Sequence, residues 1–365
     1  MQESTHIGLD VHKETIAVAV LRPDGVECDE RVIANTPTAL RKLIARFPDR
    51  TQLRTCYEAG PTGYDTQRLL ASLGVACEVI APSLIPRRSG AHVKTDRLDA
   101  RNLAHLHRAG ELTAVRVPSA AEEALRDLVR TREDLQSDRR LARQRLKSFL
   151  LRYGMRYPVP RGRWGVRYEL WLQTLSFAEP AAQAAFDHLV GACSVRDAQL
   201  VAIERQIEAA ALCEPLAEPV ARLRAFRGID TLAAVTILTE TCDFYRFGSA
   251  GSYMAFTGLV PREHSSGASR HQGAITKAGN AHIRRVLVEA AWGYRHRPAV
   301  RGKLAVRQEG LPPDLLAYSW KAQTRLHAVY CKLAARRGTN KAVVAVAREL
   351  AGFIWGAMTE RMGAA

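Results

Sequence analysis

Apolar and polar positions alternate in short runs over the first hundred residues. The runs "HIGLDVH", "ETIAVAVL" and "VECDERVIA" predict three strands, the last two joined by a turn at Asp24 and Gly25. A helix, the strand "QLRTCYEA", a second helix, the strand "VACEVIAP" and a third helix follow. This order predicts an α/β domain with a mixed five-stranded sheet and helices on both faces, as in the ribonuclease H-like fold, although several other α/β folds share it.

The pattern changes to long charged helices after the segment "VRVPS". Ser119 and Glu122 form an S-x-x-E capping box, which predicts a helix start. Arg132 and Arg139 occupy two positions of a narrow coiled-coil seam. The apolar positions of that seam are Leu125, Leu128, Leu135, Ala142, Leu146 and Phe149. We expect this helix to pair, either antiparallel or between subunits, with a second one that starts near Ser194.

The segment between these helices, about residues 153–193, is interpreted as an insertion at the tip of the pair. Its sequence "RYGMRYPVPRGRWGVRYELW" contains too much Pro and Gly for regular structure. From about Ala217 the chain is mostly helical, apart from a polar loop before "NAHIRRVLVEAAWGYRH". We therefore expect an α/β domain over 1–115, a coiled-coil region over 116–215 and a mainly α-helical domain over 216–365.

The charge balance narrows the class of partner. Lys and Arg number 53 against 37 Asp and Glu, a formal net charge of +16. Such an excess favours a polyanionic partner, of which nucleic acid is the usual one. The seven scattered cysteines contain no CxxC pair, which argues for reduced thiols and against a zinc site. Since neither a signal peptide nor a membrane span is recognisable, we expect a cytoplasmic protein without a membrane partner.

Four acidic residues stand out because the predicted fold would bring them together. Asp10 lies on the first strand, and Glu58 ends the fourth, which neighbours the first in a ribonuclease H-like sheet. Asp96 and Asp99 lie one turn apart at the start of the third helix, which would cross the same strand ends. Like charges about 4 Å apart repel by about 4 kcal/mol at an effective dielectric near 20. Mg²⁺ or Mn²⁺ would relieve this repulsion, and two ions could hold both oxygens of a phosphodiester exchange.

Each acid has a plainer interpretation when it is taken alone. An Asp pair at i,i+3 near a helix start usually caps the helix and compensates its dipole. Asp10 could pair with an arginine. His12 and Lys13, which follow it, either contact nucleic acid or serve the structure. Only the combination of these acids with the strand order favours a metal site.

Four motifs in sequence order closely resemble the DEDD-type insertion-sequence transposases: "IGLDVHKETIAVAVL", "YEAGPTGYDTQRLLASLG", "VKTDRLDARNLAHL" and "LVPREHSSGASRHQGAITKAGNAHIRRVLVEAA". In that family a RuvC-like DEDD domain precedes a domain with a serine nucleophile. The resemblance implies that Asp10, Glu58, Asp96 and Asp99 are the catalytic, metal-binding acids. The family's serine precedes the glycine of an R-x-x-x-S-G stretch, which selects Ser266 here.

Ser265, the residue before Ser266, is the alternative nucleophile. The resemblance favours Ser266, because the position of Ser265 is not serine-specific in the family. Attack by Ser266 would leave a covalent phosphoserine link and a free 3′-hydroxyl, so strands could be rejoined without ATP. Without the resemblance, such a polar stretch would simply indicate a turn. Local candidates for phosphate contacts or proton handling are Arg262, His264, Arg270 and Lys277.

Two further segments are candidates for nucleic-acid binding. The stretch from Arg139 to Arg167 mixes basic and aromatic residues, which suits RNA, or else it is a solvated helix face whose aromatics close a small core. Its proposed contacts are Arg140, Arg143, Arg145 and Lys147. "FRGIDTLAAVTILTE" resembles a helix-hairpin-helix in which backbone N–H groups near Gly228 bind phosphate. A hairpin that only packs on its own domain is an equal alternative, because Asp230 stands where the family often has glycine.

We therefore expect a DNA transposase, a site-specific recombinase that excises and inserts a mobile element. The resemblance implies that a noncoding bridge RNA pairs with donor and target DNA. It also implies a homo-oligomer, dimer to tetramer, with a composite site built from the RuvC-like and serine domains of different subunits. The alternatives are a metal-dependent endonuclease or Holliday-junction resolvase that uses water attack, and a non-catalytic nucleic-acid-binding protein.

Overall fold

The chain forms two compact units, Met1–Pro118 and Ser119–Ala365. The division expected at residue 216, inside the second unit, stays a prediction. The computed structural model describes residues 4–86, 95–159, 162–266 and 269–362, and the side chains of all of these except 264–271.

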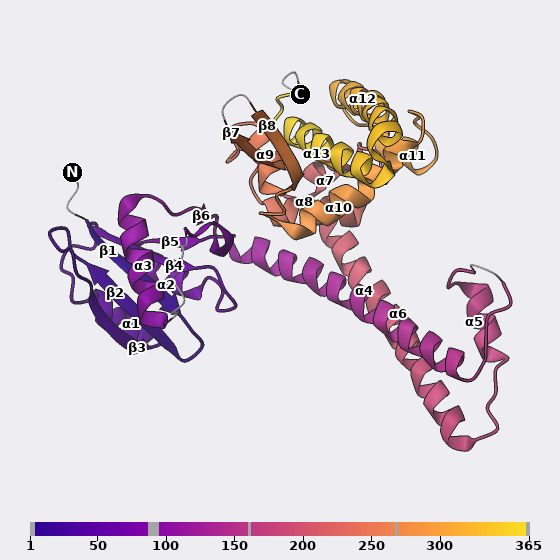
Figure 1. Cartoon of the computed structure of the whole chain (residues 1–365), viewed down its shortest axis with the longest axis horizontal. Coiled ribbons are helices and arrows are strands. Elements are labelled where there is room, and N and C mark those ends of the chain that lie inside the picture. The colour runs from indigo at the N-terminus through magenta and orange to yellow at the C-terminus, as the bar shows by residue number, and fades with distance from the viewer. Residues whose placement is uncertain (1–3, 87–94, 160–161, 267–268, 363–365) are drawn as a thin grey trace. The chain divides into compact units, whose positions relative to one another are not determined.

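The first unit is an α/β domain on a six-stranded sheet of order β3-β2-β1-β4-β5-β6 (Figure 1). Its elements are β1 (Thr5–Val11), β2 (Thr15–Leu21), β3 (Asp29–Ala34), α1 (Pro37–Ile44), β4 (Leu53–Glu58), α2 (Asp65–Ser72), β5 (Ala76–Ile80), the 3₁₀ turn η1 (Pro82–Leu84), α3 (Asp96–Ala109) and β6 (Ala114–Val115). β1 pairs antiparallel with β2 and parallel with β4, and β4 pairs parallel with β5. This mixed sheet confirms the predicted class and is consistent with a ribonuclease H-like fold. The sequence missed β6 because two residues carry no periodicity.

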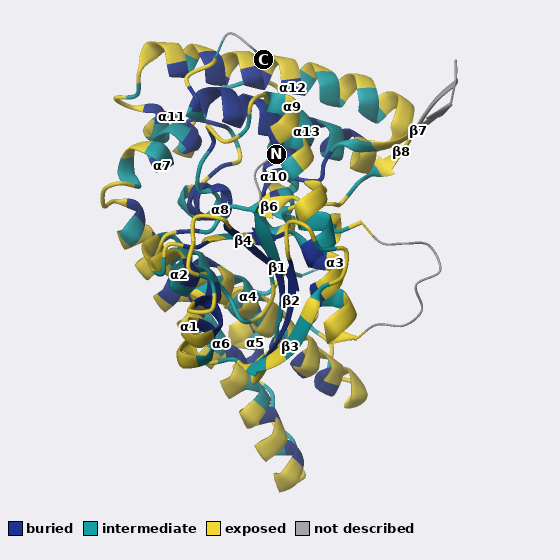
Figure 2. Cartoon of the chain, turned by 90° about the vertical axis from the view of Figure 1, so that its left-hand side faces the viewer, coloured by how far each residue is buried: buried dark blue, intermediate teal, exposed yellow. Residues whose placement is uncertain are grey.

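The two faces of this sheet bury different side chains because alternate residues of a strand point to opposite sides. Large apolar residues such as Ile7 and Leu9 pack under α1 and α2. Small residues such as Ala17 and Ala19 instead meet Ala100 of α3. Figure 2 shows buried residues gathered along β1 and β2, with exposed residues on the outer sides of the helices. α3 therefore lies closer to the sheet than helices on large side chains can.

The second unit is mainly helical and carries one two-stranded sheet. Its elements are α4 (Ala120–Arg152), α5 (Val166–Gln173), α6 (Pro180–Ala211), α7 (Ala217–Arg224), α8 (Thr231–Thr241), α9 (Ala250–Phe256), β7 (Pro261–Ser266), β8 (Ser269–Ile275), α10 (Ala281–Ala291), the 3₁₀ turn η2 (Trp292–Arg295), α11 (Lys303–Gln308), α12 (Pro313–Arg337) and α13 (Thr339–Met358). α13 is buried over most of its length between α9, α10 and α12. None of the described helices is long and apolar enough to cross a membrane.

The helices α4 and α6 run side by side in opposite directions (Figure 1). Arg132 of α4 pairs with Glu204 of α6, and Arg143, further along α4, pairs with Asp197, earlier in α6. The pair is therefore antiparallel within one chain, one of the two arrangements that the sequence left open. Coiled-coil packing of the two stays a prediction. Arg132 and Arg139, the basic residues of the seam, are tolerated there because Glu204 and Asp197 of α6 pair with them.

The expectations for the segment between these helices were wrong in two respects. α6 begins at Pro180, not near Ser194, because proline fits the first turn of a helix and an alanine-rich run follows it. α5 lies in the stretch expected to be irregular. Its Tyr168 and Leu172 pack on Leu146 of α4, so a small apolar core stabilises the helix despite the flanking Pro and Gly.

Candidate active site

Gly8 lets α3 lie directly on β1. A Cβ atom at this position would lie 2.1 Å from the carbonyl oxygen of Ala100 and 2.7 Å from the backbone nitrogen of Ala104. Both distances are far inside van der Waals contact, so no larger residue fits without moving the helix. On β4, the thiol of Cys56 donates to the carbonyl of Leu103 at 3.7 Å. These contacts hold the start of α3 near the end of β1.

Two acids and a histidine meet at this junction. The Nε2 atom of His12 lies 3.2 Å from Oδ2 of Asp10 and 3.4 Å from Oδ1 of Asp96. One ligand atom from each of the three residues lies within 4.8 Å of the others. The side chain of Asp10 is 18% exposed and that of Asp96 63%, so the cluster opens to solvent on the helix side. His12 was not predicted as part of this site, although it follows Asp10 by two residues, just after the end of β1.

Asp99 and Glu58 complete the predicted set of acids. Asp99 follows Asp96 by one turn of α3 and is half-buried. Glu58 is exposed at the end of β4. Because Leu9 pairs with Tyr57, Glu58 lies level with Asp10 on the neighbouring strand. The structure thus brings two of the acids, Asp10 and Asp96, together with His12. Asp99 lies one helical turn from Asp96, and Glu58 lies at the end of the neighbouring strand.

The capping interpretation of the Asp pair is wrong for the described helix start. The cap of α3 is Thr95, whose Oγ1 accepts a hydrogen bond from the backbone nitrogen of Leu98 at 3.3 Å. Asp96 and Asp99 are therefore not needed as the cap, although both still oppose the helix dipole.

The electrostatics of Asp10 favour a cation at this site. Burial raises the pKa of its carboxyl, His12 opposes that rise, and the charges of Asp96 and Asp99 add to it. Its negative charge is thus costly in the absence of a cation. The donor set fits a divalent metal, because carboxylate oxygens suit Mg²⁺ and an added imidazole suits Mn²⁺ and later transition metals.

The predicted serine, Ser266, lies on a β-hairpin, in a segment that was expected to be a polar loop. β7 and β8 pair antiparallel, with Ser265 opposite Arg270 and Ser266, the last residue of β7, opposite Ser269. Polar residues occupy most positions of the two strands, so no alternation of apolar and polar positions marked them as strands. Gly267 and the side chains of His264, Ser265, Ser266 and Arg270 lie outside the described residues.

The base of this hairpin is held firmly. The backbone nitrogen of Lys277 donates to Gly258 at 3.1 Å, and that of Asn280 donates to Phe256 at 2.9 Å. The Arg284 guanidinium donates to the carbonyl of Thr257 at 3.0 Å. Lys277 is exposed and has a positive φ of 56°. The serine thus lies at the far end of a hairpin with a rigid base.

An ion pair between a buried carboxylate and a partly exposed arginine joins this base to α4. Glu240 of α8 accepts two hydrogen bonds from Arg130 of α4, at 2.8 and 3.0 Å, and one from the side-chain amide of Asn280 at 2.7 Å. Burial would raise the pKa of Glu240, but these hydrogen bonds outweigh it and hold the pKa below its usual value. Nearby, Glu133 of α4 pairs with His282 of α10 at 2.6 Å. The long helix and the hairpin base therefore share one polar network.

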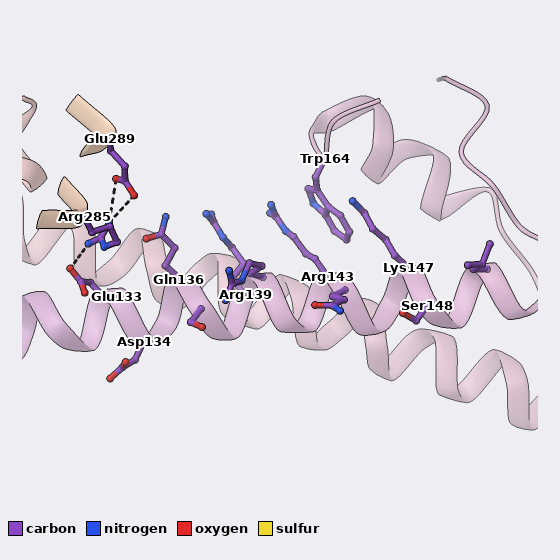
Figure 3. A pocket seen from close by; sticks show the side chains of 14 residues that line it. Glu133, Asp134, Gln136, Arg139, Arg143, Lys147, Ser148, Trp164, Arg285 and Glu289 are labelled. Atoms are coloured by element: carbon purple, nitrogen blue, oxygen red, sulfur yellow. Dashed lines mark hydrogen bonds and ion pairs between the residues drawn. The ribbon is translucent and has the colours of Figure 1, made fainter. Parts of the chain in front are cut away.

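Three of the four basic residues predicted on α4, Arg140, Arg143 and Lys147, line an open groove of about 950 Å³. Figure 3 shows Arg139, Arg143 and Lys147 extending from α4 on the side of Trp164. The Arg143 guanidinium stacks over Trp164 at 4.5 Å and pairs with Asp197 at 2.7 Å. The remaining candidate, Arg145, is exposed and does not line the groove. The aromatic residues of this region close a small core, as the interpretation of a solvated helix face expected. The basic groove beside them leaves RNA binding as a prediction.

Gly228 packs on protein. It has a φ of 84°, and a Cβ there would lie 2.5 Å from the carbonyl oxygen of Ala290 in α10. Asp230 caps α8 by accepting from the backbone nitrogen of Ala233 at 2.8 Å. Since a carboxylate already occupies this helix start, the hairpin "FRGID" fits the structural alternative better than phosphate binding.

Comparison with known proteins covers both units. A family model for the DEDD transposase of IS110 matches residues 7–155, and one described as "Transposase IS116/IS110/IS902 family" matches residues 220–304. The chain is 44% identical over 360 residues to y4qE of Sinorhizobium fredii, named as a transposase, covering 96% of this chain and 87% of that protein. It is 33% identical over 349 residues to the transposase for insertion sequence element IS1533 of Leptospira borgpetersenii, covering 92% and 99%.

The mixed sheet and the acids at the end of β1 and the start of α3 lie within residues 7–155, which match the model of a DEDD transposase domain. The chain belongs to the IS116/IS110/IS902 family of insertion-sequence transposases. Transposases of this class cut and rejoin DNA, so DNA is its substrate.

Proposed function

We propose that the chain moves its insertion sequence by cutting and rejoining DNA through a covalent phosphoserine on Ser266, assisted by Mg²⁺. The observation that carries the metal part of the proposal is the approach of Asp10, His12 and Asp96 to within 4.8 Å at the end of β1. Repulsion between carboxylates this close opposes folding unless a cation or a bound proton offsets it. The serine part is supported by the match of residues 220–304, which include Ser266, to the transposase family model.

The metal would be held by Asp10, Glu58, Asp96 and Asp99, with the imidazole of His12 as a further donor. When bound, the ion supplies Lewis-acid stabilisation of the negative charge that grows on the phosphodiester oxygens. Asp10 anchors the set from a strand, while Asp96 and Asp99 approach from a helix that Gly8 keeps close. Sites built on such elements hold their geometry better than sites on loops.

The serine step conserves the energy of the broken bond. The Ser266 hydroxyl attacks phosphorus, its proton leaves, and the bond from phosphorus to the 3′ oxygen breaks as that oxygen takes up a proton. The products are a phosphoserine ester on the 5′ side and a free 3′-hydroxyl. Reversal by a different 3′-hydroxyl joins new strands without ATP. Arg262 and Lys277, on the same hairpin and its base, are the proposed phosphate contacts, with His264 and Arg270.

We further propose that a noncoding RNA of the element guides target choice, and that the protein acts as a dimer or tetramer. The groove on α4 supports RNA binding, because Arg140 and Lys147 offer charge to a backbone beside the aromatic face of Trp164. The net charge of +16 supports it as well.

A denaturing gel tests the covalent step. Purified protein is incubated with Mg²⁺, the element's noncoding transcript and labelled donor and target DNA. We expect labelled DNA that migrates with protein, that is lost in Ser266→Ala and Asp10→Asn, and that is retained in Ser265→Ala. Nicked DNA without any adduct would overturn the proposal in favour of an endonuclease or junction resolvase that uses water.

A further inference from the structure

Arg227 fixes the loop that follows α10. Its guanidinium donates to four backbone carbonyls of that loop, those of Gly293 at 3.5 Å, His296 at 3.0 Å, Arg297 at 3.0 Å and Ala299 at 2.7 Å. One planar guanidinium with five donors can satisfy several acceptors at once. The course of the loop is thus set by a side chain from the hairpin before α8.

The partners of Arg227 are unusual for an arginine. No described carboxylate lies within ion-pair distance of it, and burial lowers the pKa of the guanidinium. The carbonyl dipoles of the loop instead compensate its charge. Because those carbonyls point toward Arg227, the backbone of the loop is held in one conformation. Most of the polar side chains of the loop are exposed to solvent.

Most of the exposed side chains of this loop are basic. The sequence holds no acidic residue between Glu289 and Glu309. Besides Val300 and Gly302, the residues exposed along the loop are Trp292, Arg295, His296, Arg297, Arg301 and Lys303. Among the described residues, no carboxylate forms an ion pair with Arg297, Arg301 or Lys303. Elsewhere in this unit, arginines such as Arg132 and Arg143 are paired with acids.

We propose that residues 292–303 bind the phosphate backbone of DNA, with the indole of Trp292 against a base or sugar. Arg297, Arg301 and Lys303 form no described ion pair with a carboxylate, and Arg295 donates only to the neighbouring His296 at 3.0 Å. This positive charge on a pinned loop suits a phosphate backbone, and an exposed indole offers a stacking surface. The inference rests on the family's action on DNA and is independent of Ser266 and of the metal site. Arg227 is the positioning residue of this surface.

Fluorescence anisotropy with a labelled 30-bp DNA duplex, in EDTA and over a salt series, tests the surface without any cleavage. In the triple variant Arg295→Gln, Arg297→Gln and Arg301→Gln, we expect the slope of log K against log salt to fall by about 2 to 3, at about 0.9 per lost contact. At about 0.1 M salt the affinity should fall about tenfold or more.

The matched control removes equal charge from another exposed surface. Arg41→Gln, Lys42→Gln and Arg46→Gln alter the outer side of α1 and the second residue after it, on the sheet face opposite Asp10. We expect this control to keep the wild-type slope within about 0.5, because it loses no phosphate contact. Equal losses in both triple variants would overturn the proposal, since net charge alone would then explain binding. A wild-type slope in the loop variant would overturn it as well.

Arg227→Lys tests the role of the pinned backbone. A lysine keeps the charge but cannot reach four carbonyls, so amides of residues 293–301 should exchange hydrogen faster and duplex affinity should fall several-fold. In the background of the loop triple variant, Arg227→Lys should have no additional effect on affinity. Unchanged exchange, or additive losses, would contradict the positioning role. If the loop triple variant loses binding to an RNA hairpin of equal length but still binds the DNA duplex, the surface binds RNA and the DNA assignment is overturned.

Discussion

Gly8 of β1 lies so close to Ala100 of α3 that a Cβ atom on the glycine would come within 2.1 Å of the alanine's carbonyl oxygen. This contact sets the height of α3 above the sheet. The height in turn sets the distance between Asp10, on the strand, and Asp96, on the first turn of the helix. The acid cluster therefore depends on a glycine that carries no chemistry of its own.

Gly8→Ala should push α3 away from β1. We expect a loss of about 1–3 kcal/mol in the free energy of unfolding, as for other overpacked cores, together with weaker divalent-metal binding. Urea unfolding and Mn²⁺ titration measure the two effects. Gly25→Ala is the control, because a Cβ there meets its nearest atom at 3.5 Å. A Gly8→Ala protein that matches this control in both measurements would contradict the packing argument.

Divalent metal should stabilise the first unit. A ligand that binds only the folded state adds about 2.7 kcal/mol at a concentration of about 100 Kd, so Mg²⁺ or Mn²⁺ should raise the Tm of the wild type. Asp10→Asn should abolish this rise, and His12→Ala should reduce the rise with Mn²⁺ more than that with Mg²⁺, since imidazole is the softer donor. Differential scanning fluorimetry with each metal checks both expectations. A metal-induced rise that survives Asp10→Asn would exclude the proposed site.

Removing Arg130 should leave Glu240 with only Asn280 as a partner. Because the Glu240 side chain is 1% exposed, Arg130→Met is expected to cost about 3 kcal/mol in the free energy of unfolding. The same substitution at Arg196, whose exposed partner Asp138 lies at 3.8 Å, should cost less than about 1 kcal/mol. Chemical denaturation of both variants measures the difference. Equal costs would contradict the special position of the buried Glu240 carboxylate.

His282 should make stability depend on pH. Its hydrogen bond with Glu133 raises its pKa above 6.5, an effect that burial and Arg130 oppose and the charge of Glu240 supports. A raised folded-state pKa means that the stabilisation is complete below pH 6.5 and is lost as the pH rises through the folded-state value. The difference in Tm between wild type and His282→Asn should therefore be largest near pH 6 and shrink toward pH 9. A difference that grows with pH would show that the neutral form is the stabilised one.

Much of the first unit could be predicted from the sequence because its strands are short apolar runs. That pattern located Asp10 and Glu58 at strand ends and Asp96 and Asp99 at a helix start. His12 was missed because a lone histidine after a strand has no pattern. Its role appears only when Asp96, far along the chain, is placed beside Asp10.

The serine hairpin and α5 were harder to predict for a different physical reason. The strand around Ser266 is polar on both sides, so hydrophobic periodicity, the main signal for a strand, is lacking. α5 is stabilised by contacts of Tyr168 with α4, and such long-range packing overrides the local influence of Pro and Gly. The four carbonyl bonds of Arg227 are likewise contacts between distant segments.

The most direct test of the central claim is to locate the DNA on the protein by mass spectrometry. The adduct formed with Mg²⁺, guide transcript and donor DNA is digested with nuclease and trypsin, which releases residues 263–270, "EHSSGASR", as one peptide. We expect a nucleotide joined through its 5′-phosphate to Ser266, as shown by fragmentation of that peptide. A nucleotide on Ser265, on Ser269 or on any other residue would contradict the assignment, and nicked DNA with an unmodified peptide would contradict the covalent mechanism.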